Sequence, residues 1–212
     1  ASFFSFRCGK YLSAGEGSAI FCADLELKGK INRIVTSFES WSTRRMLIHA
    51  LATVLKATLY NRPWYGLVGY PLGMKLDKKY NLTAKAGFET AQIASTHHAL
   101  IEKRISGFQE NIILQREHAQ ILLNKLVPGK FDLPSENVAC TSNRFQFPLR
   151  FPDSQGRDRM AGYLFDQGID TAKYLDDIVV EARSHYGYIG DCPNAEKLSK
   201  TILLIPIHYS LR

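Results

Sequence analysis

Apolar residues recur at helical spacing in two long stretches of the chain. Steps of three and four predict a helix within residues 46–60, ended by Pro63, which lacks a backbone donor. The same spacing predicts a longer helix over 85–126, with Gly107 as a candidate break. The 46–60 segment is shorter than the roughly 20 apolar residues that a membrane-spanning helix needs. We therefore expect a soluble helix there and no membrane partner.

Residues 64–74 are apolar but interrupted by three glycines and a proline. Such a broken pattern is typical of a loop over a core, or of a surface that faces a partner. Of these two alternatives, the loop over a core is favoured.

The pattern changes near residue 130, which predicts a boundary between a domain of residues 1–130 and a smaller one of residues 131–212. In the second part, turn residues separate short apolar segments, as in a small α+β domain. The predicted elements are a strand at 144–147, a helix at 159–167 ended by Gly168, an extended piece at 169–171, a helix at 194–200 and a strand at 201–206.

Composition limits the classes of function. The 212 residues, 45% of them hydrophobic, can build a sizeable core, and 27 Lys and Arg against 20 Asp and Glu give a net charge of +7. This charge favours anionic partners such as nucleotides and phosphates. The aromatic residues are not interleaved with base-binding motifs, so we expect no nucleic-acid partner.

Histidine and cysteine spacing predicts no metal site. His97 and His98 are adjacent, so on a helix they point about 100° apart and cannot form a metal-binding pair one turn apart. The four cysteines are too far apart for zinc or redox motifs and are expected to be reduced thiols in a cytoplasmic protein.

Residues 5–22 carry the candidate chemistry. An aromatic strand leads through Gly9 to Lys10, and a Gly15-Glu16-Gly17 bend leads into a second apolar strand. A lysine at such a turn either presents its amine to a pocket or is an ordinary surface residue of a hairpin. The residues by themselves favour the surface lysine.

This segment resembles the Schiff-base segment of the DegT/DnrJ/StrS family of sugar aminotransferases, fold-type I enzymes that use pyridoxal 5′-phosphate (PLP). Ser5 and Phe6 precede Lys10 by five and four residues, as in that family, and the Gly-Glu-Gly bend follows. Segments 168–171, 192–196 and 204–208 are similar to later motifs of the family, in the same order.

The resemblance implies an α/β fold: the C-terminal part of the PLP-binding large domain over 1–130, with a small α+β C-terminal domain over 131–212. The family's first half, with its phosphate cup, has no counterpart here. We therefore expect this portion to be inactive alone. For the parent protein, the resemblance implies a cytoplasmic homodimer or higher oligomer in sugar biosynthesis that transfers an amino group from an amino acid to a nucleotide-linked keto-sugar.

Residue roles follow from the same resemblance. Lys10 would bind PLP covalently and catalyse the transfer, and the hydroxyl of Ser5 would donate a hydrogen bond to the cofactor phosphate. The candidates for substrate contact are Glu16, Tyr174, His185 and Tyr186. For Glu16, a role in the turn is the favoured alternative.

A missing motif makes a different function plausible. The family's Asn-x-Arg motif should lie near residues 91–93 and is missing, and residues 46–74 look like an apolar insertion. The alternative is a relative that keeps the fold but is non-catalytic or catalyses another reaction.

Overall fold

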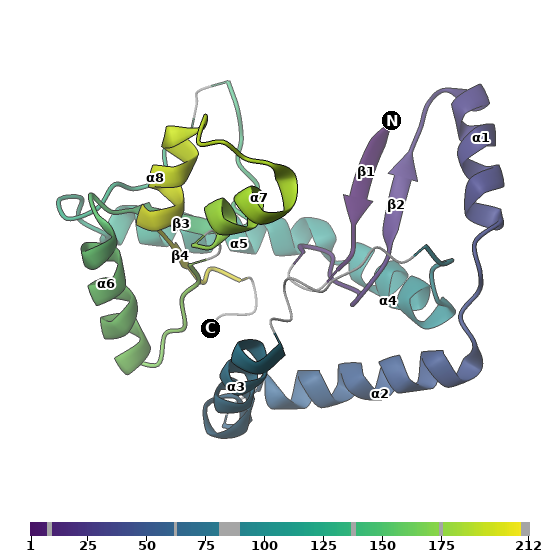
Figure 1. The fold of residues 1–212 in the computed structure, drawn as a ribbon, viewed down its shortest axis with the longest axis horizontal. Helices are drawn as coiled ribbons and strands as arrows, with labels where there is room; N and C mark the ends of the chain where they lie inside the picture. The colour runs from purple at the N-terminus through teal and green to yellow at the C-terminus, as the bar shows by residue number, and fades with distance from the viewer. Residues whose placement is uncertain (8–9, 62, 81–89, 137–138, 174–175, 209–212) are drawn as a thin grey trace. The chain divides into compact units, whose positions relative to one another are not determined.

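The computed structural model describes residues 1–7, 10–61, 63–80, 90–136, 139–173 and 176–208, in a mixed α/β fold (Figure 1). The chain divides into two compact units, Ala1–Gly107 and Phe108–Arg212. This division lies earlier than the predicted boundary near residue 130. The reason is that helix α5 (Phe108–Lys125) contributes Ala119 to the hydrophobic core of the second unit.

The first unit begins with the predicted hairpin. Strand β1 (Ser2–Ser5) pairs antiparallel with β2 (Ser18–Phe21), and Ser5 lies opposite Ser18. The rings of Phe4 and Phe21 meet edge to face at 5.3 Å. This pairing closes the loop that carries Lys10.

Helix α1 (Leu25–Thr36) follows the hairpin and was not predicted. A carboxylate oxygen of Asp24 accepts hydrogen bonds from the backbone N–H groups of Glu26, at 2.8 Å, and Leu27, at 3.1 Å. Aspartate at the N-cap satisfies donors that the first helical turn leaves unpaired. This cap was the sequence signal for the helix.

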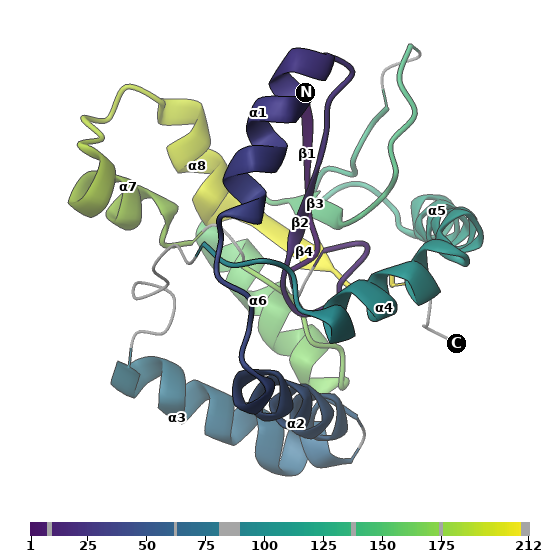
Figure 2. The same ribbon diagram turned by 90° about the vertical axis from the view of Figure 1, so that its right-hand side faces the viewer.

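Helix α2 (Thr43–Leu59) confirms the predicted helix, but the segment after it differs from the expected loop. A π-helical turn η1 (Tyr65–Gly69) leads directly into helix α3 (Tyr70–Tyr80), which Figure 2 labels together with α2. Pro71 falls in the first turn of α3, where a missing N–H is tolerated. Leu67 is 69% exposed, so the expectation of a loop over a core is wrong.

Helix α4 (Ser95–Ile105) ends just before Gly107, which confirms the break in the long helical pattern. Ile101 of α4 is buried with Phe6 and Ala14 from the loop between β1 and β2. Helix α4 therefore packs against the segment that holds Lys10.

In the second unit, β3 (Phe147–Arg150) pairs antiparallel with β4 (Ile202–Ile205), which confirms the C-terminal strand. The other strand begins three residues later than predicted. Arg144 has a φ of +52°, a left-handed conformation that a strand does not accept. The buried residues of this core are Ala119, Phe147, Leu149, Phe151, Leu203 and Ile207.

Three helices complete the second unit. Helix α6 (Ser154–Asp166) begins five residues before the prediction, because Asp153 caps it by accepting from the N–H of Gly156 at 2.7 Å. Helix α7 (Ile178–Tyr186) was not predicted, whereas α8 (Pro193–Thr201) was. None of the helices in the described ranges is long and apolar enough to cross a membrane.

Candidate functional site

Lys10 lies exposed in a loop that backbone hydrogen bonds close at its base. The N–H of Phe6 donates to the carbonyl of Gly17 at 2.9 Å, and the N–H of Ala14 donates to the carbonyl of Phe6 at 2.8 Å. The N–H of Lys10 itself donates to the carbonyl of Arg7 at 3.1 Å. The loop thus presents the Lys10 amine to solvent from a fixed base.

Ser5, at the end of β1, is half-buried at the start of this loop. Its hydroxyl oxygen accepts a hydrogen bond from the N–H of Arg7 at 3.4 Å. A hydroxyl can accept and donate at the same time, so its hydrogen stays available to a phosphate oxygen. An accessible amine and a nearby hydroxyl donor fit the chemistry of PLP binding.

The Gly15-Glu16-Gly17 bend depends on glycine. Gly15 has a φ of +94° and Gly17 a φ of +112°, which other residues rarely adopt. A Cβ at position 15 would make only an ordinary contact with Nε2 of His97, at 3.7 Å, so the backbone conformation is what requires glycine there. Glu16 is exposed between the two glycines, and its charge acts on His97.

In the sequence, His97 was considered only as half of a metal-binding pair and was not predicted as a site residue. It is buried, and its ring meets Trp41 edge to face at 5.3 Å. Burial lowers the pKa of His97; the Glu16 carboxylate opposes this shift and His49 adds to it. A neutral imidazole is therefore favoured next to the bend.

Helix α4 holds the loop at two further points. Arg104, two turns after His97, donates a hydrogen bond to the carbonyl of Ser13, and Ile101 lies between them in the buried cluster. The spacing of these three residues was the sequence signal for a shared face. His97 and Arg104, the two polar residues of this face, therefore contact the loop that carries Lys10.

The other predicted site residues belong to the second unit. Nε2 of His185, near the end of α7, lies 3.4 Å from a carboxylate oxygen of Glu181, and Tyr186 is exposed. Tyr174 lies outside the described residues. Ser5, Lys10 and Glu16 all belong to the hairpin of the first unit. The roles of the remaining candidates stay predictions.

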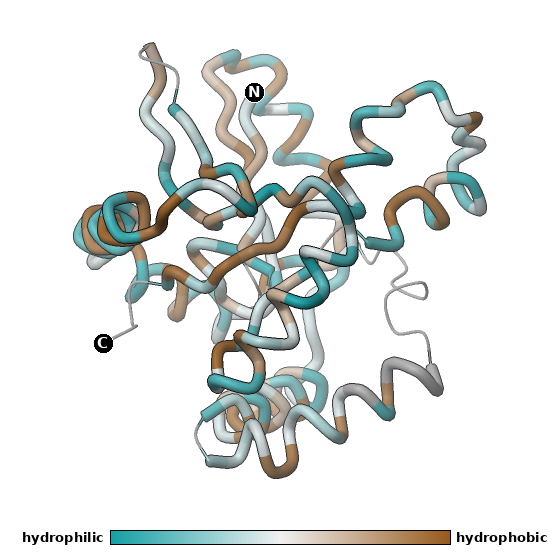
Figure 3. Tube along the Cα trace, turned by 90° about the vertical axis from the view of Figure 1, so that its left-hand side faces the viewer, coloured by the Kyte–Doolittle hydropathy of each residue, from teal (hydrophilic) through white to brown (hydrophobic). Residues whose placement is uncertain are grey.

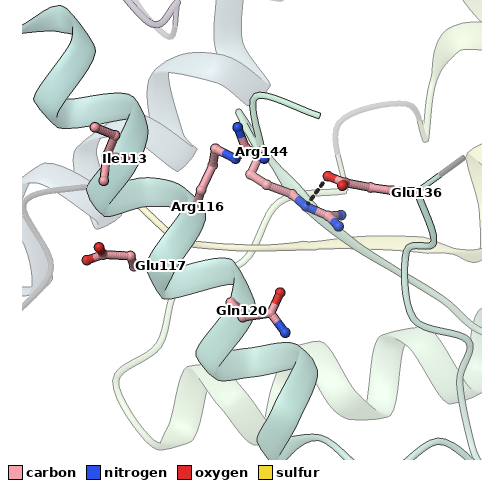
Figure 4. Close-up of a pocket in the computed structure, with 6 residues that line it drawn as sticks. All are labelled: Ile113, Arg116, Glu117, Gln120, Glu136 and Arg144. Atoms are coloured by element: carbon pink, nitrogen blue, oxygen red, sulfur yellow. Dashed lines mark ion pairs between the residues drawn. The ribbon is translucent and has the colours of Figure 1, made fainter. Parts of the chain in front are cut away.

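A pocket of about 360 Å³ in the second unit was not predicted (Figure 4). Its lining residues are Ile113, Arg116, Glu117, Gln120, Glu136 and Arg144. Arg144 pairs with Glu136 at 3.1 Å, and the buried amide of Gln115 donates to the carbonyl of Arg144 at 2.7 Å, which holds its left-handed backbone. Because the pocket has carboxylates as well as cations, it offers no selective anion site.

In the described ranges, no group of three or more His, Cys, Asp or Glu residues is placed to hold a metal ion. The chemistry that the hairpin offers is that of an accessible amine, a hydroxyl and a carboxylate.

Comparison with known proteins gives a family match and several similar folds. The sequence profile of the DegT/DnrJ/EryC1/StrS aminotransferase family matches residues 1–212. The aminotransferase TlmJ from Streptoalloteichus hindustanus is 19% identical with a TM-score of 0.64, over 99% of this chain and 47% of that one. DesV from S. venezuelae is 18% identical with a TM-score of 0.66, with the same coverage.

A third similar structure is the E. coli GDP-4-keto-6-deoxy-D-mannose-3-dehydratase with bound hydrated PLP. It is 16% identical with a TM-score of 0.60, over 98% of this chain and 50% of that one. The chain therefore spans about half the length of these structures, and at such identities the likeness shows the fold alone. No curated protein matches the sequence.

Proposed function

The chain belongs to the DegT/DnrJ/EryC1/StrS aminotransferase family, and on that premise we propose that the whole protein transfers an amino group from an amino acid to a nucleotide-linked keto-sugar, with PLP as cofactor. The observation that carries the proposal is the exposed Lys10, on a loop closed at its base, within a segment that matches the family's cofactor lysine.

Lys10 has the chemistry that this reaction requires. PLP, when bound, supplies an aldehyde that links to an amine and a ring that accepts an electron pair. Lys10 would hold PLP through its amine, and once the amino donor has taken its place, Nζ would accept the proton of the donor's α-carbon. An arginine in its place would stay protonated and could not act as a base.

The neighbouring side chains have supporting roles in this proposal. The Ser5 hydroxyl, which accepts from the N–H of Arg7, would donate to the cofactor phosphate. The neutral ring of His97 lies next to Gly15 and stabilises the bend. Glu16 then stays at the surface, where it can contact a substrate. His185 and Tyr186 of α7, and Tyr174, are further proposed substrate contacts.

We also propose that the working protein is a homodimer or higher oligomer, as the family resemblance implies. The mass of the full-length protein in solution, measured by light scattering at micromolar concentration, tests this. A monomeric mass would contradict it.

The experiment for the proposed activity follows 2-oxoglutarate formation by the full-length protein with glutamate, PLP and a nucleotide-linked keto-sugar. Lys10→Ala is expected to abolish turnover, because no other side chain on the hairpin replaces its amine. Lys28→Ala is the matched control, since Lys28 is an exposed lysine of α1 in the same unit. Turnover that survives in Lys10→Ala would refute the role of Lys10.

A second function is favoured by two observations. The E. coli dehydratase matches the chain as completely as the aminotransferases do, and the Asn-x-Arg motif is missing near residues 91–93. A dehydratase would remove water from the keto-sugar without adding nitrogen to it. Transfer of ¹⁵N from labelled glutamate into the sugar would support the aminotransferase. Loss of water with no ¹⁵N in the sugar would support the dehydratase.

A further inference from the structure

Most of the chain's net charge lies in one segment that the candidate lysine site does not use. Residues 40–80, called here the basic segment, contain seven Lys and Arg against one Asp. They therefore account for +6 of the total charge of +7, and no acidic residue occurs between Glu39 and Asp77. The basic segment comprises α2, η1 and α3 with the residues around them.

Helix α2 turns its polar side toward its own unit. The ring of His49 meets Trp41 at 4.6 Å, and the Arg45 guanidinium lies 4.0 Å from the centre of the Trp41 ring. Met46, on the same side, accepts a long hydrogen bond from the hydroxyl of Ser95 at 3.8 Å. These contacts fix which face of α2 points inward.

The opposite face of α2 is an exposed apolar stripe. Its residues are between 55% and 70% exposed: Leu47, Ile48, Leu51, Val54 and Leu55. A helix on the surface of a globular protein normally turns such a stripe to the core. In α2 the arrangement is reversed, so that none of the described residues covers this row of large apolar side chains.

Large apolar residues stay exposed beyond α2. Trp64 is 51% exposed and Leu67 69%, and Leu72 and Leu76, one turn apart on α3, are exposed as well. The rings of Tyr60 and Tyr65 stack at 5.7 Å across the junction between α2 and η1. In the hydropathy-coloured trace, hydrophobic positions recur among hydrophilic ones along these helices (Figure 3).

We propose that the basic segment docks on the surface of a membrane that contains anionic phospholipids. An amphipathic helix with Leu and Trp on one face and Lys and Arg near it lies in the interface between headgroups and acyl chains. Clustered basic residues add attraction to an anionic leaflet. The proposal places the segment on the membrane surface, and no helix in the described ranges is long and apolar enough to cross a membrane.

This proposal departs from the expectation of no membrane partner. Helical periodicity shows that a stripe exists, but only tertiary contacts such as those of Arg45 and His49 show that it faces outward. The proposal does not depend on the proposed enzymatic activity. A second copy of the chain is less suited to cover this apolar face, because two basic segments of charge +6 would repel each other.

The test is flotation of the full-length protein with vesicles. We expect it to float with vesicles of phosphatidylcholine containing about one third phosphatidylglycerol, and not with phosphatidylcholine alone, because attraction to the anionic leaflet is required. Raising the salt concentration should weaken the binding. Replacing Arg44 and Lys75 by Gln should weaken it by about fivefold for each charge removed. Arg33→Gln, outside the segment, should have no effect.

The apolar contribution is tested by the double variant Leu51→Glu, Val54→Glu, which is expected to lose binding. Leu25→Glu is the matched control, because Leu25 is 81% exposed in the same unit but lies outside the basic segment. The proposal is overturned if the wild-type protein does not float. It is also overturned if the double variant binds as the wild type does, or changes only the oligomeric mass.

A measurement on the folded wild-type protein removes any dependence on destabilised variants. The two tryptophans of the chain, Trp41 and Trp64, both lie in the basic segment, and Trp64 is the more exposed. Brominated anionic lipids should quench tryptophan emission, and Trp64→Phe should remove most of the quenching. Emission unchanged by brominated lipid would contradict docking through this segment.

Discussion

Replacing Gly17 by alanine tests whether the bend after Lys10 requires glycine. Gly17 has a φ of +112°, and an added Cβ would lie 2.7 Å from Cδ1 of Ile93. Two costs are therefore possible in principle: backbone strain and a steric clash. The Ile93 side chain is 39% exposed and meets the new atom with its terminal carbon, so it can turn away.

Strain should account for most of the loss. A residue other than glycine in a sparsely populated region of φ costs about 1–3 kcal/mol. We therefore expect Gly17→Ala to lower the free energy of unfolding of the first unit by about 2 kcal/mol. Gly29→Ala is the control with the opposite sign, because Gly29 lies within α1 with no atom near its added Cβ. It should raise that free energy by roughly 0.5–1 kcal/mol.

Tryptophan emission during denaturant unfolding measures this loss in the first unit alone. Both tryptophans lie within Ala1–Gly107, so unfolding of the second unit does not change their surroundings directly. Adding Ile93→Ala to Gly17→Ala should recover little stability. The reasoning fails if Gly17→Ala is within about 0.5 kcal/mol of the wild type, the range of neutral surface changes. It also fails if the second substitution restores full stability.

Three further predictions concern the two units. Phe147→Ala should lower the free energy of unfolding of the second unit by about 3–5 kcal/mol, because it leaves a cavity in that core. Circular dichroism should detect this loss, whereas the unfolding transition seen by tryptophan emission should not change. Because the folded pKa of His97 lies below 6.5, the unfolded chain binds the proton more readily, so the first unit should lose stability as pH falls below 6.5. His97→Gln should flatten this dependence; an unchanged pH profile would contradict it. Asp24→Ala should lower the free energy of unfolding by about 1 kcal/mol, because the N-cap of α1 is lost; denaturant unfolding measures this. An unchanged free energy would contradict a stabilising role of the cap.

Segments with strong local signals could be predicted from the sequence. The hairpin around Lys10, the break at Gly107, helix α8 and strand β4 each follow from apolar periodicity with glycine or proline at the ends. Helix α1 was missed although the sequence carries two signals for it: Asp24 marks its start, and Leu27, Ile31, Ile34 and Val35 recur at helical spacing.

Features that depend on tertiary contacts could not be predicted. The burial of His97 follows from Trp41, which is distant in sequence, and from the bend at Gly15. The late start of β3 follows from the left-handed Arg144, which the amide of Gln115 holds in place across the fold. Periodicity also left open whether the stripe of α2 faces the core or the solvent.

The attachment site of the cofactor tests the central claim most directly. The full-length protein is incubated with PLP, reduced with borohydride, digested and mapped by mass spectrometry. We predict that the pyridoxyl group is on Lys10, and that Lys10→Ala takes up no label while Lys28→Ala is labelled as the wild type is. A pyridoxyl group on another lysine, with Lys10 unmodified, would contradict the assignment.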